Sequence, residues 1–192
     1  VHLSVVDKDG NNVFTVDKNK QPQGLFSHAI GGLLKTTPDF LSFYAPHSNS
    51  YRRLVHNADH APTTLSWGNE NRTALIRLPE ASAEATRLEF RVASADSNPY
   101  LVFASILASV YSGIQGKLQH DKETIGNAHA QHPPSLGVTW REAVEKTSVS
   151  SLVKDFFGEQ FQQCYTCVKE SEIKRFESTI TDFEYHSYLR SL

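Results

Sequence analysis

The sequence predicts an α+β fold, an antiparallel sheet backed by helices. Segments between residues 63 and 92 alternate apolar with polar or charged residues, which is typical of strands with one buried face. Later segments carry apolar residues every three or four positions, which is typical of helices. With 192 residues, 39% hydrophobic and 21% charged, the chain has the composition of one globular domain. We therefore expect residues 1–192 to form a single domain.

The charge and hydropathy of the chain argue against nucleic-acid and membrane partners. A formal net charge of -2 and a pI near 6.5 provide no basic surface field. The sequence has no apolar run of ~18 residues, and no charged-apolar-small leader opens it. We expect a cytoplasmic protein. Because the chain has no methionine and begins inside an apolar strand pattern, we interpret it as a piece of a longer protein.

The first quarter of the chain predicts two short strands and then two helices. Apolar residues at positions 1, 3 and 5 alternate with His2 and Ser4, so these two side chains share one strand face. The turn sequence D-K-D-G-N-N separates this strand from a second one, V-F-T-V. Apolar residues then recur at helical spacing over 23–46, where Pro38 is expected to begin the second helix.

Arginines border the three predicted strands T-T-L-S-W, T-A-L-I-R-L and R-L-E-F-R-V. A guanidinium is always charged and is rarely buried without a partner, so arginines along core strands indicate that anions lie between them. The alternation alone fits equally well a sheet whose outer face meets water. Glu89 and Arg91 are two positions apart and should point to the same face. The arginines of this region are Arg52, Arg53, Arg72, Arg77, Arg87 and Arg91.

The second half of the chain is predicted to be largely helical. Residues 98–118 indicate a strongly apolar, buried helix with Asn98 as N-cap and Pro99 in its first turn. Residues 119–139 favour a surface loop, and the spacing of its histidines does not indicate a metal site. Residues 140–146, 150–157 and 159–189 have helical spacing. We interpret Cys164 and Cys167, a lone C-x-x-C, as reduced thiols on a helix.

The order of several motifs resembles the C-terminal half of the glutamine synthetase catalytic domain. These motifs are N-S-Y-x-R-L-V from Asn49, N-R-T-A-L-I-R from Asn71, R-x-E-x-R from Arg87 and N-P-Y-L-x-x-A from Asn98. The opening V-H-L-S is similar to the end of the family's H-x-H-x-S strand, and T-D-F-E-x-x-x-Y-L lies near the other end. The resemblance therefore covers nearly the whole chain.

In that family, ATP phosphorylates the side-chain carboxylate of glutamate, and ammonia or an amine displaces the phosphate. The resemblance implies an ATP-dependent carbon-nitrogen ligase that forms a gamma-glutamyl phosphate, uses Mg2+ or Mn2+, and is a homo-oligomer at full length. The sequence R-V-A-S-A-D-S-N-P-Y-L-V is more similar to the branch that joins glutamate to amines such as polyamines than to the branch that uses ammonia. The alternative is a non-catalytic family member with a binding or structural role.

The resemblance also implies a role for individual residues. Arg53 would hold the substrate carboxylate, for which a planar guanidinium fork is suited, and Arg91 the glutamate carboxylate or its phosphorylated form. Glu89 would be a metal ligand, but one glutamate cannot supply the several oxygen ligands that magnesium needs. We expect catalytic roles for Arg53, Arg72, Arg91, Asp59 and His60. We expect nucleotide contacts from His2, Ser4, Arg72, Arg77 and Arg87.

The segment 54–62, L-V-H-N-A-D-H-A-P, departs from the family's usual P-G-Y-E-A-P. It offers Asp59 or His60 where the family has a glutamate that shields the intermediate and helps to deprotonate ammonium. A carboxylate attracts a small cation, whereas a histidine could serve as general base toward a bulkier amine. A solvated loop with two incidental polar residues is the third interpretation.

Overall fold

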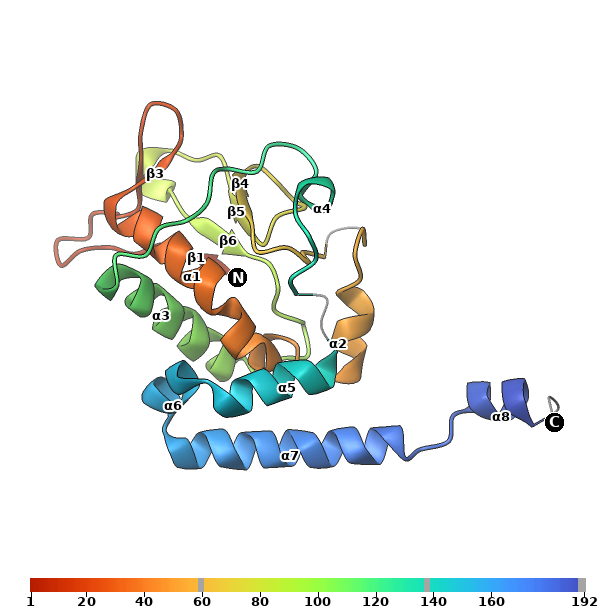
Figure 1. The fold of residues 1–192 in the computed structure, drawn as a ribbon. Helices are drawn as coiled ribbons and strands as arrows, with labels where there is room; N and C mark the ends of the chain where they lie inside the picture. The colour runs from red at the N-terminus through yellow and green to blue at the C-terminus, as the bar shows by residue number, and fades with distance from the viewer. Residues whose placement is uncertain (59–60, 137–138, 190–192) are drawn as a thin grey trace.

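The computed structural model describes residues 1–58, 61–136 and 139–189, and it confirms the α+β fold class (Figure 1). In chain order the elements are β1 (His2–Leu3), β2 (Thr15–Val16), β3 (Pro22–Gln23), α1 (Gly24–Tyr44), α2 (Ser48–Arg53), β4 (Trp67–Asn69), β5 (Ile76–Leu78), the 3-10 turn η1 (Ala83–Ala85), β6 (Leu88–Phe90), α3 (Pro99–Gln115), α4 (Ala128–Gln131), α5 (Trp140–Val149), α6 (Ser151–Phe157), α7 (Glu159–Glu177) and α8 (Asp182–Tyr188). The two short strands expected at the start, β1 and β2, are both present.

The main sheet has the strand order β1-β6-β5-β4. Strands β1 and β5 pair with β6 in antiparallel fashion, as expected, whereas β4 runs parallel to β5. In the connection between β4 and β5, Glu70 has a positive φ of 50° and the Asn71 side chain accepts a hydrogen bond from the Thr73 backbone N–H. The sheet is therefore antiparallel except at its β4 edge.

The strand expected at T-T-L-S-W begins only at Trp67. Thr63, Thr64 and Ser66 before it are buried but belong to no strand. The Thr63 carbonyl instead accepts hydrogen bonds from the backbone N–H groups of Ser135 and Leu136. The Thr64 and Ser66 hydroxyls lie 2.8 Å apart and bond to each other. Pairing with a loop distant in sequence thus replaces the expected strand.

Helix α1 lies at the centre of the fold and is one helix, so the prediction of two helices over 23–46 is wrong. Pro38 lies inside it. The proline has no N–H to donate, but the Thr37 hydroxyl donates to the Leu33 carbonyl at 2.6 Å, and Phe40 and Leu41 beyond the proline are fully buried. Packing on both sides of Pro38 therefore offsets the missing backbone hydrogen bond and continues the helix.

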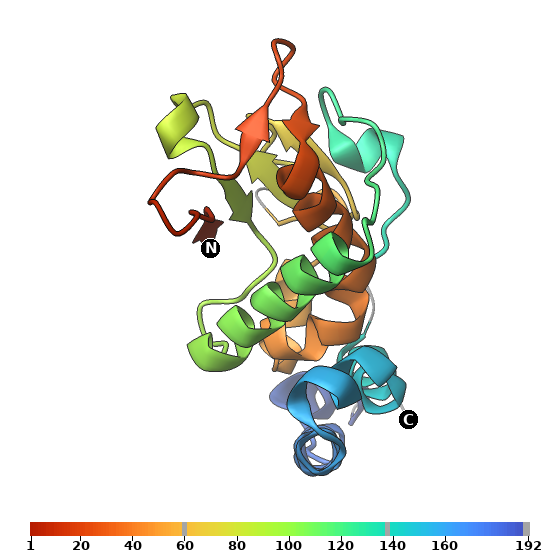
Figure 2. The same cartoon turned by 90° about the vertical axis from the view of Figure 1, so that its left-hand side faces the viewer.

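The other layers are arranged around α1, which packs against α3, α5, α6 and the β2–β3 hairpin. Figure 2 shows α3 alongside α1, with α7 seen end-on below them. On the sheet side, the rings of Tyr44 in α1 and Phe90 in β6 meet edge to face with their centroids 5.0 Å apart. Helix α7 is joined to the core by Tyr165, whose hydroxyl donates to the Ser42 carbonyl at 2.7 Å.

Helix α3 begins as expected, because the Asn98 side chain accepts a hydrogen bond from the Tyr100 backbone N–H and Pro99 follows Asn98. The helix is not buried all round, however, and this corrects the expectation of a core helix. Only one side packs against α1, and the other leaves an exposed apolar stripe of Tyr100, Phe103, Leu107 and Tyr111. Among the described residues, no helix is long and apolar enough to span a membrane.

The expected helix over 159–189 is interrupted, so it forms α7 and α8. The break follows from a new start signal, because Thr181 and Glu184 form a capping box that begins α8. Figure 1 shows α8 extending away from the remaining elements. Apolar residues are accordingly exposed there, since Ile180 just before α8 and Phe183 within it retain 78% and 70% of their accessible surface.

Helices α1 and α3 cross at very short distance, and this contact gives the first testable prediction. A Cβ added at Gly32 would overlap the Ser109 carbonyl oxygen and would lie 2.7 Å from the Gly113 Cα, so α3 would have to move. We expect Gly32→Ala to lower the free energy of unfolding by about 1–3 kcal/mol, measured by urea denaturation.

Gly116→Ala is the matched control for this substitution. The atom nearest to its added Cβ lies 3.0 Å away, at the end of α3, so a much smaller loss is expected. Equal urea midpoints for the wild type and Gly32→Ala would show that the helix crossing is not tightly packed.

Candidate functional site

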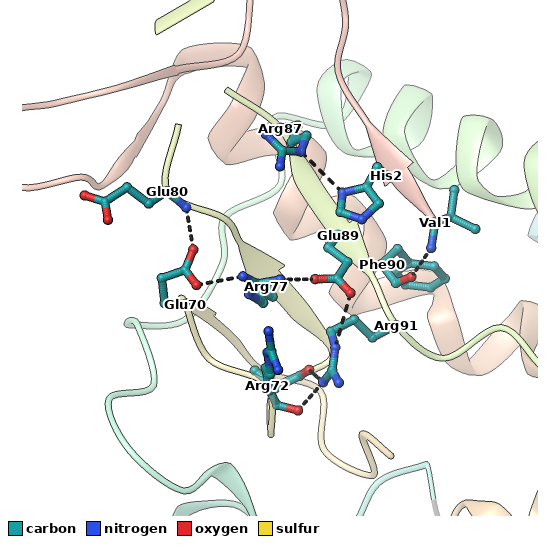
Figure 3. Close-up of polar contacts among 11 residues, drawn as sticks. Val1, His2, Glu70, Arg72, Arg77, Glu80, Arg87, Glu89, Phe90 and Arg91 are labelled. Carbon is teal, nitrogen blue, oxygen red and sulfur yellow. Dashed lines mark hydrogen bonds and ion pairs between the residues drawn. The ribbon is translucent and has the colours of Figure 1, made fainter. Parts of the chain in front are cut away.

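Three charged or titratable side chains lie next to one another on the polar face of the main sheet. Strand pairing places His2 of β1 directly opposite Glu89 of β6, and Arg77 of β5 opposite Glu89 on its other side. Residues paired in this way project from the same face of a sheet, so the three side chains are neighbours on that face (Figure 3). Leu88 and Phe90, which flank Glu89, point to the opposite face and are buried in the core.

Glu89 lies between two arginines at the centre of this group (Figure 3). Its Oε2 accepts a hydrogen bond from Arg77 Nη1 at 2.8 Å, and its Oε1 lies 3.8 Å from Arg91 Nε. Arg77 also donates from Nη2 to Glu70 Oε2 at 2.7 Å. Glu70, Arg77, Glu89 and Arg91 therefore form a continuous chain of alternating charge across the sheet, which we call the charged row.

The electrostatic environment keeps Glu89 ionised. Burial raises the pKa of this carboxyl, but the hydrogen bond and charge of Arg77, with the charges of Arg91 and His2, more than offset it. The net result is a pKa below the ordinary value of 4.5. Glu89 is thus a fixed negative charge near neutral pH.

Positive charge is concentrated around Arg91. Burial lowers the pKa of its guanidinium, and although Glu89 opposes this, the charges of Arg77, Arg72 and Arg53 lower the pKa further. Arg91 Nη1 donates to the backbone carbonyls of Arg72 and Ala74, the latter at 3.1 Å. Bringing four guanidiniums together costs free energy that a bound anion would recover, so this face of the sheet favours an anionic ligand.

Donors that could meet such an anion are present on the same face. Arg77 Nε is buried without a hydrogen-bond partner, although the rest of that guanidinium is paired. Arg72 is exposed, and within the described part of the chain no hydrogen bond or ion pair involves its guanidinium. The exposed Arg72 can therefore donate to a phosphate or carboxylate oxygen, since guanidinium donors match the geometry of these anions.

Arg53 and Arg87 lie at the two ends of the cluster. Arg53, the last residue of α2, donates from Nη2 to the Val92 carbonyl at 2.6 Å and to the Ser94 hydroxyl at 3.3 Å. Burial lowers its pKa. Arg87 donates from Nε to His2 Nδ1 at 3.4 Å (Figure 3). Residues from β1 and β6 and from the end of α2 therefore converge on one region.

The structure thus brings together most of the residues selected from the sequence, namely His2, Arg53, Arg72, Arg77, Arg87, Glu89 and Arg91. Ser4 is exposed two residues beyond His2, and no hydrogen bond of its side chain to the cluster is found among the described residues. Asp59 and His60 lie outside the described residues.

Glu70 is the residue of the charged row that the sequence interpretation missed. It precedes the predicted strand by several positions and shares no alternation with Arg77. The two side chains meet only because β4 runs parallel to β5, with Asn69 opposite Leu78. Sequence periodicity carries no signal for such an edge pairing.

These residues do not by themselves fit a metal ion. No group of three or more His, Cys, Asp or Glu suited to a metal occurs in the described ranges. Glu89 offers one carboxylate, and both of its oxygens already face arginines. Magnesium prefers several oxygen ligands in near-octahedral geometry.

Within the described ranges, the histidines of 119–139 and the two cysteines do not form a metal centre. His129 is buried, and its Nδ1 bonds to the Thr63 hydroxyl at 3.1 Å, whereas His132 Nε2 bonds to the Thr124 hydroxyl at 2.8 Å. His120 Nδ1 lies 2.8 Å from the Asp121 carbonyl oxygen. These bonds account for the histidines of 119–139 as structural groups. Cys164 and Cys167 are free and exposed on α7.

A family comparison agrees with this geometry, since the model of the glutamine synthetase catalytic domain matches residues 1–188. A gamma-glutamylputrescine synthetase of Escherichia coli (strain K12) is 31% identical over 191 residues, which is 100% of this chain and 40% of that protein. A gamma-glutamylethanolamide synthetase of Streptomyces coelicolor is 33% identical over 184 residues, or 96% and 39% of the two chains. A glutamine synthetase of Methanosarcina mazei is 34% identical over 197 residues, or 96% and 43%.

The fold and the family match define this chain as a catalytic domain of the glutamine synthetase type. The chain belongs to the glutamine synthetase family, as the sequence motifs indicated. It spans about two-fifths of the length of the curated relatives above, which are covered to 40%, 39% and 43%.

The lowered pKa of Glu89 gives a second prediction, on the pH dependence of stability. A carboxyl with a lowered folded-state pKa stabilises the protein above its unfolded pKa near 4.5, and this contribution is lost as the pH falls through the folded value. Glu89→Gln removes the contribution. We expect the variant to be less stable than the wild type at neutral pH and the difference to shrink between about pH 5 and about pH 3.

Urea midpoints measured across this pH range would check the prediction. Glu145→Gln, on the exposed side of α5, is the control and should leave the pH dependence of the midpoint unchanged. A constant difference between Glu89→Gln and the wild type at all pH values would contradict the ion-pair assignment.

Proposed function

We propose that this chain is part of an ATP-dependent ligase that joins the γ-carboxylate of glutamate to ammonia or a primary amine. Membership of the family supports the reaction class. The single observation that carries the proposal is the concentration of Arg53, Arg72, Arg77 and Arg91 around one ionised carboxylate, Glu89. Such a site suits two anionic substrates held side by side, since like charges of the ligands are separated by fixed cations.

Within this proposal, Glu89 divides the site into two halves. Arg77 and the outward-facing Arg72 lie on the side suited to phosphate, and catalysis of phosphoryl transfer depends mainly on positioning and on stabilising charge at the phosphate oxygens. Arg91, with Arg53 behind it, lies on the side suited to the glutamate carboxylate. Phosphorylation of the γ-carboxylate to a gamma-glutamyl phosphate would occur where the halves meet.

The nucleotide would extend from the phosphate half past Glu89 toward the β1 edge, because β6 lies between β5 and β1. His2 and Arg87 already contact each other there, and Ser4 lies further along the same segment. We propose that this chain contributes Glu89 to Mg2+ or Mn2+ binding. The other ligands would come from elsewhere in the protein, because the residues of the described ranges do not complete a site. We expect the 192-residue chain on its own to show little turnover for the same reason.

The acceptor and the assembly also belong to the proposal. Asp59 or His60 would receive a proton from the bound ammonium or amine, and the full-length protein would be a cytoplasmic homo-oligomer. The alternative, from another class, is a family member that binds these ligands without turnover. Kinetic measurements on the full-length protein distinguish the two.

Substitutions of Glu89 and Arg91 give the third prediction, because Glu89 is the proposed metal ligand between the two halves whereas Arg91 lies in the glutamate half. Glu89→Ala should reduce kcat on the order of 100-fold, the scale of losing one preorganised electrostatic group. Arg91→Ala should raise the KM for glutamate and also lower kcat, since it contacts substrate in both the ground and transition states. Phosphate release by the full-length protein measures both effects.

Lys174→Ala, an exposed substitution on α7, is the control for general damage and should leave kcat and KM unchanged. Near-normal kinetics in both Glu89→Ala and Arg91→Ala would mean that the charged row is only an outer sheet face with incidental ion pairs.

Choice of acceptor gives the fourth prediction, which rests on D-H-A-P at residues 59–62 in place of the family's Y-E-A-P. We expect kcat/KM to be higher with putrescine than with ammonia. His60→Ala should reduce amine use more than glutamate phosphorylation, because a histidine would act as general base only in the second step. Competition between the two acceptors measures the preference, and an equal or higher kcat/KM with ammonia would refute it.

A further inference from the structure

Glu70, directly after β4, has an unfavourable backbone conformation. Its φ of 50° lies in the left-handed region, which side chains such as glutamate rarely adopt. Hydrogen bonds hold the backbone there, because the Glu70 N–H donates to the Leu78 carbonyl at 3.0 Å and the Asn69 N–H donates to Glu123 Oε1 at 2.9 Å. Conformations of this kind persist where their surroundings hold them, and they cluster at functional sites.

The Glu70 carboxylate uses both of its oxygens (Figure 3). Oε2 accepts a hydrogen bond from Arg77 Nη2 at 2.7 Å, and Oε1 accepts one from the backbone N–H of Glu80, which lies just beyond β5. A carboxylate that is bonded at both oxygens has little freedom to rotate. Glu70 is therefore a fixed acceptor for the Arg77 guanidinium.

Arg77 is in turn held from two sides. Its Nη1 donates to Glu89 at 2.8 Å, and its Nη2 donates to Glu70. A guanidinium is planar, so bonds at two of its nitrogens fix the direction of the plane as well as the position of the group. Each of these nitrogens carries another hydrogen that a ligand oxygen can accept. Glu70 thus determines how Arg77 presents its remaining N–H groups.

The pair of Glu70 and Arg77 contributes little to the stability of the fold. The Glu70 side chain retains 50% of its accessible surface, and exposed ion pairs stabilise proteins only slightly. The positive φ of Glu70 itself costs free energy. A weakly stabilising ion pair on an unfavourable backbone favours a role at the site over a role in folding.

We propose that Glu70 is a positioning residue, which orients Arg77 toward the phosphate that is transferred in the ligase reaction. This inference rests on the proposed function. Donors that are already in place stabilise the charge that develops on the phosphate oxygens without having to reorganise. Glu70 acts through Arg77, and its own negative charge opposes the binding of a phosphate. Its contribution therefore appears in kcat and not in nucleotide affinity.

Phosphate release by the full-length protein tests this role with two substitutions. Glu70→Ala removes the carboxylate but keeps a side chain at the unfavourable φ. We expect kcat to fall about tenfold, the scale of losing a group that orients another, without an increase in the KM for ATP. Glu70→Gln keeps an oxygen that can accept from Arg77 and should recover part of the loss in kcat. The urea midpoint should change little in either variant.

Glu80→Gln is the matched control. It removes a neighbouring exposed carboxylate, which pairs with Lys20, and leaves the Glu80 backbone N–H in place. It should change neither kcat nor the KM for ATP. An unchanged kcat in Glu70→Ala, with an active wild type, would overturn the proposal.

Modification by phenylglyoxal, located by mass spectrometry, provides a readout that does not depend on turnover. We expect Arg77 to react faster in Glu70→Ala than in the wild type, because Nη2 loses the carboxylate that covers it. The exposed Arg72 is the internal reference and should react equally in both proteins. An inactive wild type would refute the proposed function, whereas equal Arg77 rates in the two proteins would overturn the positioning role.

Discussion

The candidate site depends on one interaction, the hydrogen-bonded ion pair between Arg77 of β5 and Glu89 of β6. Their hydrogen bond at 2.8 Å holds one negative charge among several guanidiniums, and this charge offsets part of the repulsion between them. Without that carboxylate, the positive charges around Arg91 would repel one another in a half-buried environment. The opposite face of the same two strands is fully buried, so the position of the pair is set by the packing of the core.

Much of the site could be predicted from the sequence because strands of period two sort residues by face. In R-L-E-F-R-V the alternation places Arg87, Glu89 and Arg91 together and buries Leu88 and Phe90, as the structure shows. The start of α3 was equally predictable, since an asparagine cap followed by proline is a local signal. Features decided within a few residues were therefore recovered.

Features that depend on contacts between distant segments could not be predicted from the sequence. Nothing in the neighbourhood of Glu70 shows that a parallel strand pair will bring it to Arg77. Pro38 looks like a helix start, but the surrounding core packs well enough to continue α1 through it. The exposed side of α3 is another case, because an apolar helix does not reveal which of its faces the described chain covers. In each case tertiary packing outweighed the local preference.

We propose that the arginine cluster binds the phosphates of a nucleotide. Isothermal titration of ADP into the full-length protein tests it most directly, with Arg72→Gln compared with the wild type. We expect the substitution to raise the dissociation constant for ADP on the order of 10- to 100-fold, the effect of losing hydrogen bonds to a charged group, and to change glutamate affinity little. An unchanged dissociation constant for ADP would contradict the claim.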